Sequence, residues 1–378
     1  MVYILTGNIE NFVQKTIGRK VICFGAGEHL DCIFKRFAKE NLYHYVDMVA
    51  DNKKELWGTV RHYKEKEYPV ISFNELCAYA QYDQILILIT NHWYFNEIIA
   101  QMDQEGTLDQ TEVFVGDLLD IPVVDYPPFE IQCRKEEKIP RVIHYCWFGG
   151  GEIPAQLQAY METWKACCPD YTIRRWDETN YNVTKNRYMK QAYDKKMWAF
   201  VSDYARVDIV HQYGGIYLDC DVELRKPLDV FLGEDLYCGF EDYRHIALGL
   251  GFGSVPGHPY LRSLLEYYEN LTFVDDKGKL NLTACPVYQT EVIESYGIFA
   301  ENRFQKSDRI TVYPTEVFSP YSHRGIGKVT DKTYSIHHFS ASWETASERK
   351  KFAQWKPLLK RLMERIQEQQ KEEKQWKN

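Results

Sequence analysis

Short apolar runs alternate with amphipathic stretches over the N-terminal third of the chain, which is the pattern of an α/β domain with a parallel sheet. The apolar runs predict strands at Lys20–Phe24, Tyr45–Ala50 and Gln84–Thr90. After the first of them, residues His29 to Lys39 have apolar side chains at helical spacing and predict an amphipathic helix. We therefore predict a small, doubly wound, parallel-sheet domain over residues 1–125.

A proline-rich connector from Ile121 to Pro128 separates this domain from a second one, which we predict over residues 126–346. A further strand pattern begins at Pro140 and enters a glycine-rich loop, Gly149-Gly150-Gly151. Loops that follow the strands of an α/β sheet are the position at which such sheets bind ligands. The second domain is therefore also predicted to be α/β, with a ligand near the end of this strand.

Residues 347–378 form one long helical pattern. Apolar side chains recur at i, i+3 and i+4 spacing, at Phe352, Trp355, Leu359, Leu362 and Ile366. The segment is net basic although the whole protein is acidic. This C-terminal amphipathic helix therefore either docks on the second domain or makes peripheral contact with an anionic membrane.

Composition narrows the class of protein. With 378 residues, 45% apolar residues and 15% aromatic residues, the chain is long and apolar enough for two well-packed domains. A net charge of -8 argues against general nucleic-acid binding, because phosphate backbones recruit basic surfaces. The 10 cysteines are scattered without a Cys-x-x-Cys motif, which indicates reduced thiols and a cytoplasmic location. The N-terminus does not resemble a signal peptide, and no apolar run is long enough to span a bilayer.

The most informative chemistry lies at Asp219 and Asp221, which follow the apolar run Ile216-Tyr217-Leu218. If the strand continues, these two side chains share one face and Cys220 takes the other. Two carboxylates at a strand end can bind a hard divalent cation and leave coordination positions for phosphate oxygens. The pair therefore predicts a Mg²⁺ or Mn²⁺ site for an activated phosphate compound such as a nucleotide diphosphate.

A helical segment precedes the acid pair and places Asp203 and Arg206 three residues apart, on one helical face. Gly214-Gly215 allows this helix to end and turn sharply into the strand. The helix and the acid pair are therefore predicted to lie close together. The alternative for Asp203 and Arg206 is an ordinary helix ion pair.

The motif Ser-Asp-x-x-Arg, then Tyr-Gly-Gly-Ile-Tyr-Leu-Asp-x-Asp, then Lys226-Pro227-Leu228, resembles the glycosyltransferases with a DXD sugar-binding region (glycosyltransferase family 32). This retaining group includes bacterial capsule enzymes and Och1-like mannosyltransferases. The segment is similar, more distantly, to the glucosyltransferase domains of large clostridial toxins. The resemblance implies a GT-A type catalytic domain that binds a nucleotide sugar.

The resemblance also implies roles for the residues of the motif. Asp219 and Asp221 would bind the metal that bridges the donor diphosphate, and Asp203 and Arg206 would hold donor-sugar hydroxyls or the ribose. These four residues are the predicted catalytic set.

The first strand of the second domain and its loop, with Cys146 and Trp147, would hold the base and ribose of the donor. Trp147 would stack on the base, because an aromatic face binds any base by stacking. The alternative is a tryptophan of the core. His144 lies on the face opposite Trp147 and is predicted to be a packed core histidine.

The segment Ser335 to Trp343 resembles the closing element of the same family, in which one histidine or a nearby polar group joins the metal and a Ser-Trp pair covers the diphosphate. His337 and His338 point to opposite faces of a strand, so that at most one can be a ligand, and we choose His337. Histidine completes the coordination of Mn²⁺ better than that of Mg²⁺. Ser342 and Trp343 are the predicted diphosphate contacts. The alternative is that the histidines only bond to backbone carbonyls.

Two other segments each have two possible interpretations. Glu241 and Asp242 either contact sugar hydroxyls or form a solvated loop. The segment Thr283 to Pro286 has Ala284-Cys285 where the family often has a glycine, which puts a binding role for that loop in doubt.

The N-terminal domain contains an incomplete dinucleotide fingerprint, Gly25-Ala26-Gly27-Glu28-His29-Leu30, with Asp51 where a ribose-binding acid would lie. It looks like the Rossmann-like domain of sugar C-methyltransferases. That domain either handles nucleotide sugars or serves as a scaffold.

These observations predict a metal-dependent, retaining glycosyltransferase that uses a nucleotide-sugar donor, a UDP-sugar in preference to others. The expected acceptor is a glycan or lipid-linked glycan of a bacterial capsular or other cell-surface polysaccharide, in the cytoplasm or at the inner membrane face. The alternatives are an oxidoreductase or methyltransferase of nucleotide sugars and a non-catalytic assembly factor.

Overall fold

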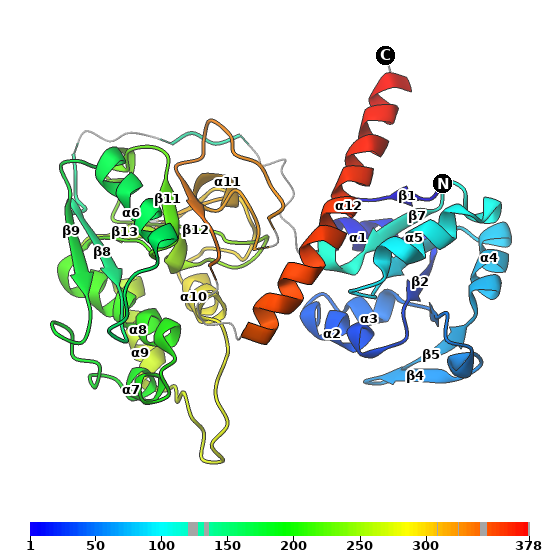
Figure 1. Ribbon diagram of the computed structural model, residues 1–378, viewed down its shortest axis with the longest axis horizontal. Coiled ribbons are helices and arrows are strands. Elements are labelled where there is room, and N and C mark those ends of the chain that lie inside the picture. Colours follow the sequence, from blue (N-terminus) through cyan, green and yellow to red (C-terminus); the bar gives the residue numbers. More distant parts are fainter. Residues whose placement is uncertain (120–127, 132–135, 308, 324, 341–345, 377–378) are drawn as a thin grey trace. The chain divides into compact units, whose positions relative to one another are not determined.

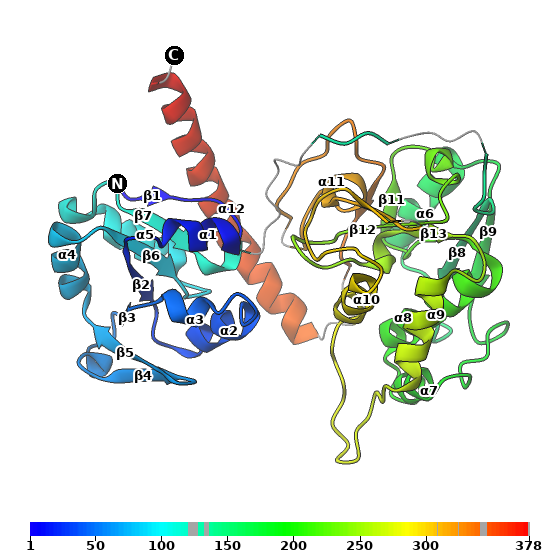
Figure 2. The ribbon, with the colours of Figure 1, turned by 180° about the vertical axis from the view of Figure 1, so that it is seen from behind.

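The computed structural model describes residues 1–378 except 120–127, 132–135, 308, 324, 341–345 and 377–378 (Figure 1). The chain divides into two compact units. Unit 1 combines residues 1–121 with residues 345–378, and unit 2 comprises residues 122–344. The red C-terminal helix in Figures 1 and 2 therefore belongs with the blue N-terminal elements, although the whole of unit 2 separates them in sequence.

Unit 1 is built on a parallel sheet that ends in one antiparallel hairpin. In the described residues its strand order is β1-β7-β6-β2-β3-β5-β4, and only β4 and β5 pair antiparallel. The strands are β1 (Tyr3–Ile4), β2 (Lys20–Phe24), β3 (Met48–Ala50), β4 (Val60–Tyr63), β5 (Lys66–Ile71), β6 (Ile85–Ile89) and β7 (Glu112–Val115). The strands predicted from the apolar runs are β2, β3 and β6, and all five residues of β6 are buried, as in a sheet covered on both faces.

The helices of unit 1 connect these strands and begin at recognisable signals. Asn8 and Ser72 each form a capping box, with Asn11 and Glu75 respectively. The helices are α1 (Ile9–Lys15), α2 (Glu28–Arg36), α3 (Leu42–Tyr45), α4 (Phe73–Tyr82), α5 (Phe95–Asp103) and α12 (Ala346–Trp376), with 3-10 turns η1 (Lys54–Leu56), η2 (Gly106–Leu108) and η3 (Gly116–Leu118). The predicted amphipathic helix is α2.

The incomplete dinucleotide fingerprint forms the turn between β2 and α2. The Asp51 carboxylate accepts hydrogen bonds from the backbone N–H of Ala26 at 2.7 Å and of Lys53 at 2.9 Å. The acid that would contact a ribose therefore fastens the glycine turn to the end of β3. This arrangement favours the scaffold alternative for unit 1.

The C-terminal helix α12 packs on unit 1. Trp355, Leu359, Leu362 and Ile366 are buried there, whereas the side chain of Phe352 lies outside the described part of the chain. Near the other end, Gln369 accepts a hydrogen bond from the Ile4 N–H at 2.9 Å and donates one to the Ile4 carbonyl at 3.0 Å. Docking on the second domain is thereby corrected, because unit 1 covers that stripe. Peripheral contact of this net basic helix with an anionic membrane stays a prediction.

Among the described helices, none combines the length and the apolar content that spanning a membrane requires.

Unit 2 contains a mixed sheet with the strand order β14-β15-β12-β13-β10-β8-β9, and a separate antiparallel pair of β11 with β16. The strands are β8 (Val142–Cys146), β9 (Thr172–Trp176), β10 (Gly215–Tyr217), β11 (Val222–Leu224), β12 (Leu236–Gly239), β13 (Phe252–Ser254), β14 (Gln305–Lys306), β15 (Thr311–Tyr313) and β16 (Ser335–His337). β8 pairs parallel with both β9 and β10, and β10 pairs antiparallel with β13.

The helices of unit 2 cover this sheet. They are α6 (Ala155–Cys167), α7 (Arg187–Asp194), α8 (Trp198–Tyr213), α9 (Pro259–Glu269), α10 (Cys285–Glu294) and α11 (Thr315–Phe318), with 3-10 turns η4 (Asp229–Phe231) and η5 (Leu248–Leu250). Helix α8 is buried along an unbroken stretch from Val207 to Val210, and its acid Asp203 and base Arg206 are buried as well. Adjacent residues of β10 enter different hydrophobic clusters: Ile216 joins one and Tyr217 the other.

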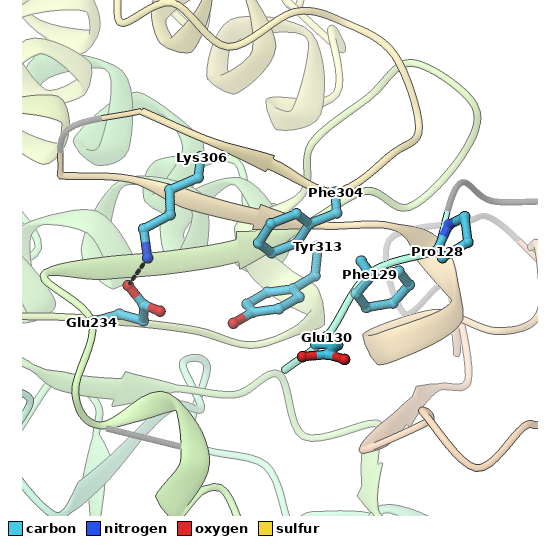
Figure 3. A pocket seen from close by; sticks show the side chains of 7 residues that line it. All are labelled: Pro128, Phe129, Glu130, Glu234, Phe304, Lys306 and Tyr313. Carbon is cyan, nitrogen blue, oxygen red and sulfur yellow. Dashed lines mark hydrogen bonds and ion pairs between the residues drawn. The ribbon is translucent and has the colours of Figure 1, made fainter. Parts of the chain in front are cut away.

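A cavity of about 240 Å³ lies beside β14 and β15 (Figure 3). Its lining consists of Pro128, Phe129, Glu130, Glu234, Phe304, Lys306 and Tyr313. None of the residues that the sequence predicts for a site lines this cavity, so the candidate chemistry lies elsewhere in unit 2.

The packing of α12 yields a testable prediction. Leu362 is fully buried against unit 1, so Leu362→Ala should lower the free energy of unfolding of unit 1 by about 2–5 kcal/mol. Lys360 is on the same helix with its side chain 78% exposed, so Lys360→Ala should change it by less than about 0.5 kcal/mol. Hydrogen exchange of the full-length chain, read on peptides of β1 and β7, measures both. Equal protection in the two variants would contradict the packing.

Candidate functional site

The acid pair lies in a tight turn that leaves the central sheet. β10 ends at Tyr217, and the Val222 N–H donates to the Asp219 carbonyl at 3.0 Å before β11 begins. Asp219 and Asp221 are therefore not successive inward residues of one strand, as the extended geometry predicted. They face the same space because this backbone hydrogen bond closes a turn that folds the chain back on itself. A strand pattern does not indicate such a turn.

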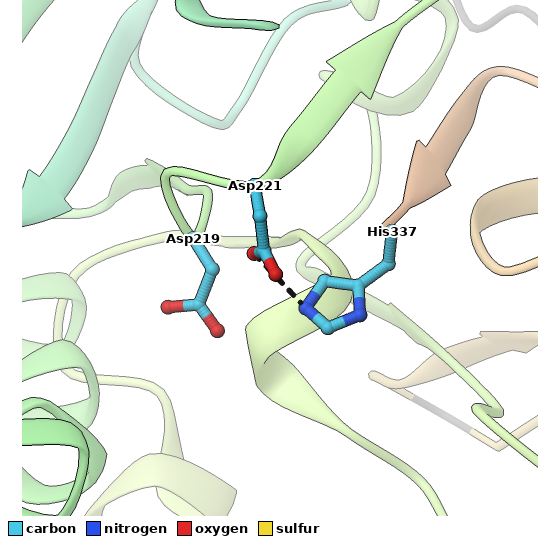
Figure 4. Close-up of side chains that lie close together, drawn as sticks. All are labelled: Asp219, Asp221 and His337. Atoms are coloured by element: carbon cyan, nitrogen blue, oxygen red, sulfur yellow. Dashed lines mark ion pairs between the residues drawn. The ribbon is translucent and has the colours of Figure 1, made fainter. Parts of the chain in front are cut away.

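The pairing of β11 with β16 brings a histidine to this turn. Val222 lies opposite His337 in the register, and this places the His337 ring next to Asp221. His337 Nε2 lies 3.2 Å from Asp221 Oδ1 (Figure 4). Asp219, Asp221 and His337 each offer one ligand atom, and these atoms all lie within 4.8 Å of one another.

His338 turns away from the acid pair. Its Nε2 lies 2.9 Å from Glu223 Oε2, and its ring stacks on Tyr160 with the ring centroids 4.0 Å apart. Of the two adjacent histidines, the structure brings His337 to the acids, as the opposite faces of a strand require.

Asp221 fixes the returning chain as well as facing the site. Its Oδ2 accepts a hydrogen bond from the Ser340 N–H at 2.7 Å, and its carbonyl accepts one from the His338 N–H at 3.0 Å. The segment that follows β16 is therefore bound to the acid itself.

Asp219 has one oxygen engaged by the protein and one available. Tyr217 donates its hydroxyl to Asp219 Oδ1 at 2.9 Å, and Arg206 Nη2 lies 3.3 Å from the same oxygen. Among the described residues, none is seen to bond with Oδ2. A carboxylate oriented in this way by neighbouring groups can present a single oxygen to a cation.

Arg206 is buried and directs its N–H groups to the protein. Nη2 contacts Asp203 Oδ1 at 3.1 Å, Nε donates to the Ser202 carbonyl at 3.2 Å, and Nη1 faces the Cys285 sulfur at 4.0 Å. Asp203 and Arg206 are thus more than an exposed helix pair, because Arg206 joins α8 to the acid turn. The resemblance implies that these two residues contact the sugar or ribose. In the structure Arg206 contacts Asp219, and Asp203 pairs with Arg206.

Gly249 is a site residue that the sequence analysis did not identify. A Cβ at this position would lie 2.8 Å from Arg206 Nη1 and would overlap Asp219 Oδ2 outright. The backbone also approaches closely, since Asp219 N–H donates to the Gly249 carbonyl at 3.3 Å. The glycine run from Leu248 to Gly253 was the available signal, but only the tertiary contact shows which glycine matters.

The charges of the site shift the pKa values in opposite directions. Burial raises the pKa of Asp219, although Arg206 opposes it. Burial also acts to raise the pKa of Asp221, but His337 and the Ser340 N–H outweigh it and hold that pKa well below its usual range. Burial acts to lower the pKa of His337, and the Asp221 charge more than offsets this, so that the pKa is raised above 6.5.

The remaining predicted residues lie around this centre. Cys146 is buried behind it, where burial raises the pKa of its thiol to about 12. Trp147 follows β8 and donates its indole N–H to the Gly151 carbonyl at 2.7 Å, so the glycine loop fixes its ring. Ser342 and Trp343 lie outside the described residues.

His144 belongs to the core, as expected. Its Nε2 lies 2.9 Å from the Gly214 carbonyl and its Nδ1 accepts the Trp176 indole N–H at 3.1 Å. Burial lowers its pKa to about 4, so it is neutral at physiological pH.

The cluster fits a divalent cation by its chemistry. Two carboxylates and an imidazole form an oxygen and nitrogen donor set that can hold a divalent cation. The Nδ1 atom of His337 is buried without a hydrogen-bond partner among the described residues. A single ion in contact with Asp219 Oδ2, Asp221 Oδ1 and His337 Nε2 would use one atom without a bond to the described residues and two atoms that lie against each other.

Comparison with known proteins places the acid pair in a recognised segment. Residues 154–237 match the family model described as "Glycosyltransferase sugar-binding region containing DXD motif". This segment includes Asp203, Arg206, Asp219 and Asp221 and is less than half of the chain. The sequence matches support a glycosyltransferase family for this region of unit 2.

Curated relatives carry glycosyltransferase names. An uncharacterized glycosyltransferase of Acanthamoeba polyphaga mimivirus is 27% identical over 217 residues, covering 54% of this chain and 84% of the relative. Inositol phosphoceramide mannosyltransferase 3 of Schizosaccharomyces pombe is 27% identical over 160 residues, and mannosyltransferase 1 is 29% identical over 187 residues. The alignments cover 40% and 47% of this chain and 44% and 54% of those two relatives, about half their length.

Solved structures align only partly. The PaToxG glycosyltransferase aligns with a TM-score of 0.35 at 16% identity, over 42% of this chain and 70% of its own. A glycosyltransferase involved in the glycosylation of the major capsid of PBCV-1 aligns with a TM-score of 0.33 at 11% identity, over 57% and 99%.

The close approach at Gly249 predicts a sensitive position. Gly249→Ala should displace the Asp219 carboxylate and lower the affinity for Mn²⁺ by about 10- to 100-fold, the range for disturbed metal-site geometry. Gly106→Ala, in unit 1, is the matched control, because its Cβ would meet no atom within 4 Å. Electron paramagnetic resonance of Mn²⁺ titrations measures both, and unchanged affinity in Gly249→Ala would contradict the geometry.

The Asp221–His337 pair predicts how metal affinity depends on pH. A folded-state pKa raised above 6.5 means that the pair stabilises the metal-free protein at low pH and that this contribution is lost as the pH rises through the folded pKa of His337. A metal needs the neutral imidazole, so Mn²⁺ affinity should rise by up to about tenfold per pH unit until that pKa is passed. Asp221, with its depressed pKa, stays ionised throughout this range.

Isothermal titration of Mn²⁺ between about pH 6 and pH 8.5 measures this dependence. In His337→Ala the affinity should be lower and its pH dependence reduced. The same slope in the variant and the wild type would show that another group titrates.

Proposed function

We propose that unit 2 is a metal-dependent, retaining glycosyltransferase of the GT-A type that transfers a sugar from a nucleotide-sugar donor to a glycan acceptor. The observation that carries the proposal is the convergence of Asp219, Asp221 and His337 on one point, with the two acids inside the segment that matches the DXD sugar-binding family. A strand pairing from a distant part of the chain supplies the histidine. Such convergence is expected of a ligand site and is not needed for the fold.

In this proposal Asp219 Oδ2, Asp221 and His337 hold Mn²⁺ or Mg²⁺. The ion would offset the negative charge of the departing diphosphate. Tyr217 and Arg206 hold Asp219 in place from behind, and Asp203 balances the buried guanidinium. Ser342 and Trp343 are proposed, from the resemblance alone, to close over the diphosphate.

Retention of configuration requires no protein nucleophile in a front-face reaction. The oxygen of the departing phosphate takes the proton of the acceptor hydroxyl, and the new glycosidic bond forms on the face from which the phosphate leaves. The chain contributes positioning and electrostatic stabilisation. The sequence offers no certain nucleophile, which agrees with this route.

The donor is proposed to be a UDP-sugar, with Trp147 stacked on the base beside the glycine loop. Trp147 is half-buried and its indole N–H is already bonded to Gly151, so that the ring is held in one orientation. Cys146, immediately before it, has its thiol buried and would take part only through its backbone. The acceptor is proposed to be a glycan or lipid-linked glycan, and the two yeast relatives are named for a lipid acceptor.

The cellular setting is proposed from composition and resemblance. Nine cysteines of the described residues are free, which suits a reducing compartment such as the bacterial cytoplasm. A part in capsular or other cell-surface polysaccharide synthesis is proposed from the resemblance, and peripheral contact with an anionic membrane from the net basic charge of residues 347–378.

A second candidate function is a non-catalytic assembly factor. A non-catalytic role is favoured for unit 1, because the Asp51 carboxylate is hydrogen-bonded to the backbone of its own glycine turn and of Lys53. Both functions can coexist in one chain, with unit 1 as scaffold and unit 2 as enzyme.

The test is a screen of nucleotide sugars for Mn²⁺-dependent hydrolysis and thermal stabilisation of the full chain. At least one donor should be turned over, and Asp219→Asn or Asp221→Asn should lower that rate by about 100-fold or more. Asp194→Asn changes an exposed acid of α7 that pairs with Lys190 and should leave the rate unchanged.

Unfolding temperatures of the metal-free variants show whether each substitution is tolerated by the fold. A response to none of the donors, or full activity in both acid variants, would overturn the proposal.

A further inference from the structure

The imidazole of His337 is not oriented from behind by a hydrogen bond to any of the described residues. Its Nε2 faces Asp221 Oδ1 at 3.2 Å, and its Nδ1 is buried without a partner among those residues. A histidine that binds a metal almost always donates its other ring N–H to a carboxylate, a carbonyl or a water, and this bond fixes the ring. Asp219, by contrast, is held by Tyr217 and Arg206. A different kind of contact is therefore needed to fix the imidazole.

The ring of Phe339 makes such a contact. The Phe339 and His337 rings meet edge to face, with their centroids 4.4 Å apart and their planes at 88°. Aromatic pairs favour this arrangement, because the positive edge of one ring meets the negative face of the other. The Phe339 ring is itself held, since His323 lies edge-on to it at 6.3 Å and it packs against the buried cluster that includes Leu218 and Val222.

The backbone of Phe339 has an unusual conformation at the same place. Its φ is +48°, in the left-handed region that residues with a bulky side chain rarely adopt. The register of β11 with β16 would bring Ser340 opposite Asp219 if both segments stayed extended. Instead, the Ser340 N–H donates to Asp221 Oδ2 at 2.7 Å. The left-handed residue thus turns the chain onto Asp221.

Both features of Phe339 therefore act on residues of the candidate metal cluster. Its ring packs on His337, and the turn at its backbone brings a donor to one oxygen of Asp221, which leaves the other oxygen beside His337 Nε2. Burial in the core would explain an aromatic ring at this position. It would not explain the left-handed backbone, which is costly and is retained only where the surrounding structure requires it.

We propose that Phe339 is a positioning residue of the metal cluster. Its ring holds the His337 imidazole in place of the customary hydrogen bond, and its backbone turn orients Asp221. Phe339 offers no ligand atom and acts through these two neighbours. The inference rests on the proposed function of unit 2, because it assumes that the cluster binds a metal.

Phe339→Gly separates the ring from the turn. Glycine adopts a φ of +48° freely, so the bond from Ser340 to Asp221 is kept and only the ring is lost. The affinity of the full chain for Mn²⁺ should then fall by about 10- to 100-fold, the range for partners that orient a metal ligand. Phe339→Tyr keeps the ring and should bind Mn²⁺ as the wild type does. Isothermal titration with Mn²⁺ measures these affinities.

The metal-free protein offers a readout that a loss of stability alone would not produce. An aromatic ring 4.4 Å away shifts the nuclear magnetic resonance signals of the His337 ring protons. Histidine-selective labelling should show this shifted signal, which is assigned by its absence in His337→Ala. The shift should disappear in Phe339→Gly and persist in Phe339→Tyr. Phe299→Gly, at an exposed phenylalanine of unit 2, is the matched control and should leave both the signal and the affinity unchanged.

Each outcome decides between the proposals. If Phe339→Gly binds Mn²⁺ as tightly as the wild type, or if the His337 signal does not move, the role of Phe339 is overturned while the metal cluster stands. If the wild type binds no Mn²⁺, the metal dependence of the proposed function is refuted, and the inference falls with it. Phe339→Leu keeps apolar bulk without a ring, so it supplies the same two measurements if the glycine variant unfolds.

Discussion

A guanidinium buried as deeply as that of Arg206 must find acceptors for its N–H groups, and in unit 2 it finds them on several elements. Asp203 and the Ser202 carbonyl come from its own helix, Asp219 from the turn after β10, and the Cys285 sulfur from the start of α10. A buried ion pair is costly to break once formed, because the charge left behind has no solvent. Arg206 therefore fixes α8, the acid turn and α10 relative to one another, and the orientation of Asp219 depends on it.

The second constraint is the β11–β16 pair, which joins residues more than a hundred positions apart. Its register places His337 opposite Val222, and Asp221 secures the segment beyond it through the Ser340 N–H. Asp221 thus has a structural and a ligand-facing role at once. This explains why its carboxylate stays ionised: it is anchored by a cation and a backbone donor, while the more weakly compensated Asp219 has its pKa raised by burial. The pKa values of the two acids of one motif are therefore shifted in opposite directions.

The sequence allowed much of this site to be predicted, for a physical reason. Asp203, Arg206, Asp219 and Asp221 lie within nineteen consecutive residues, so a helix, a glycine turn and a strand suffice to bring them together. The parallel sheet of unit 1 was likewise readable, because apolar runs and helical spacing are local properties. Strand alternation predicted that at most one of His337 and His338 could reach the acids, and the register of β11 with β16 brings His337 there.

What could not be predicted depends on contacts between distant segments. Gly249 matters because Asp219 Oδ2 occupies the space of its absent side chain, and one glycine in a run of three does not reveal this. Cys285, whose replacement of glycine cast doubt on its loop, proves to face Arg206. One backbone hydrogen bond closes the turn at Asp219, and the apolar strand pattern does not predict it.

The C-terminal helix shows the same limit and adds a consequence for the whole chain. Its apolar stripe is a local pattern of the sequence, and such a stripe does not indicate which surface covers it. Gln369 bonds both the N–H and the carbonyl of Ile4, as a neighbouring strand would, and so covers the edge of a sheet that would otherwise expose unpaired backbone groups. Because the polypeptide forms unit 2 before it reaches α12, unit 1 cannot complete this edge until unit 2 has been synthesised. The order of the chain therefore couples completion of the unit 1 sheet to the synthesis of unit 2.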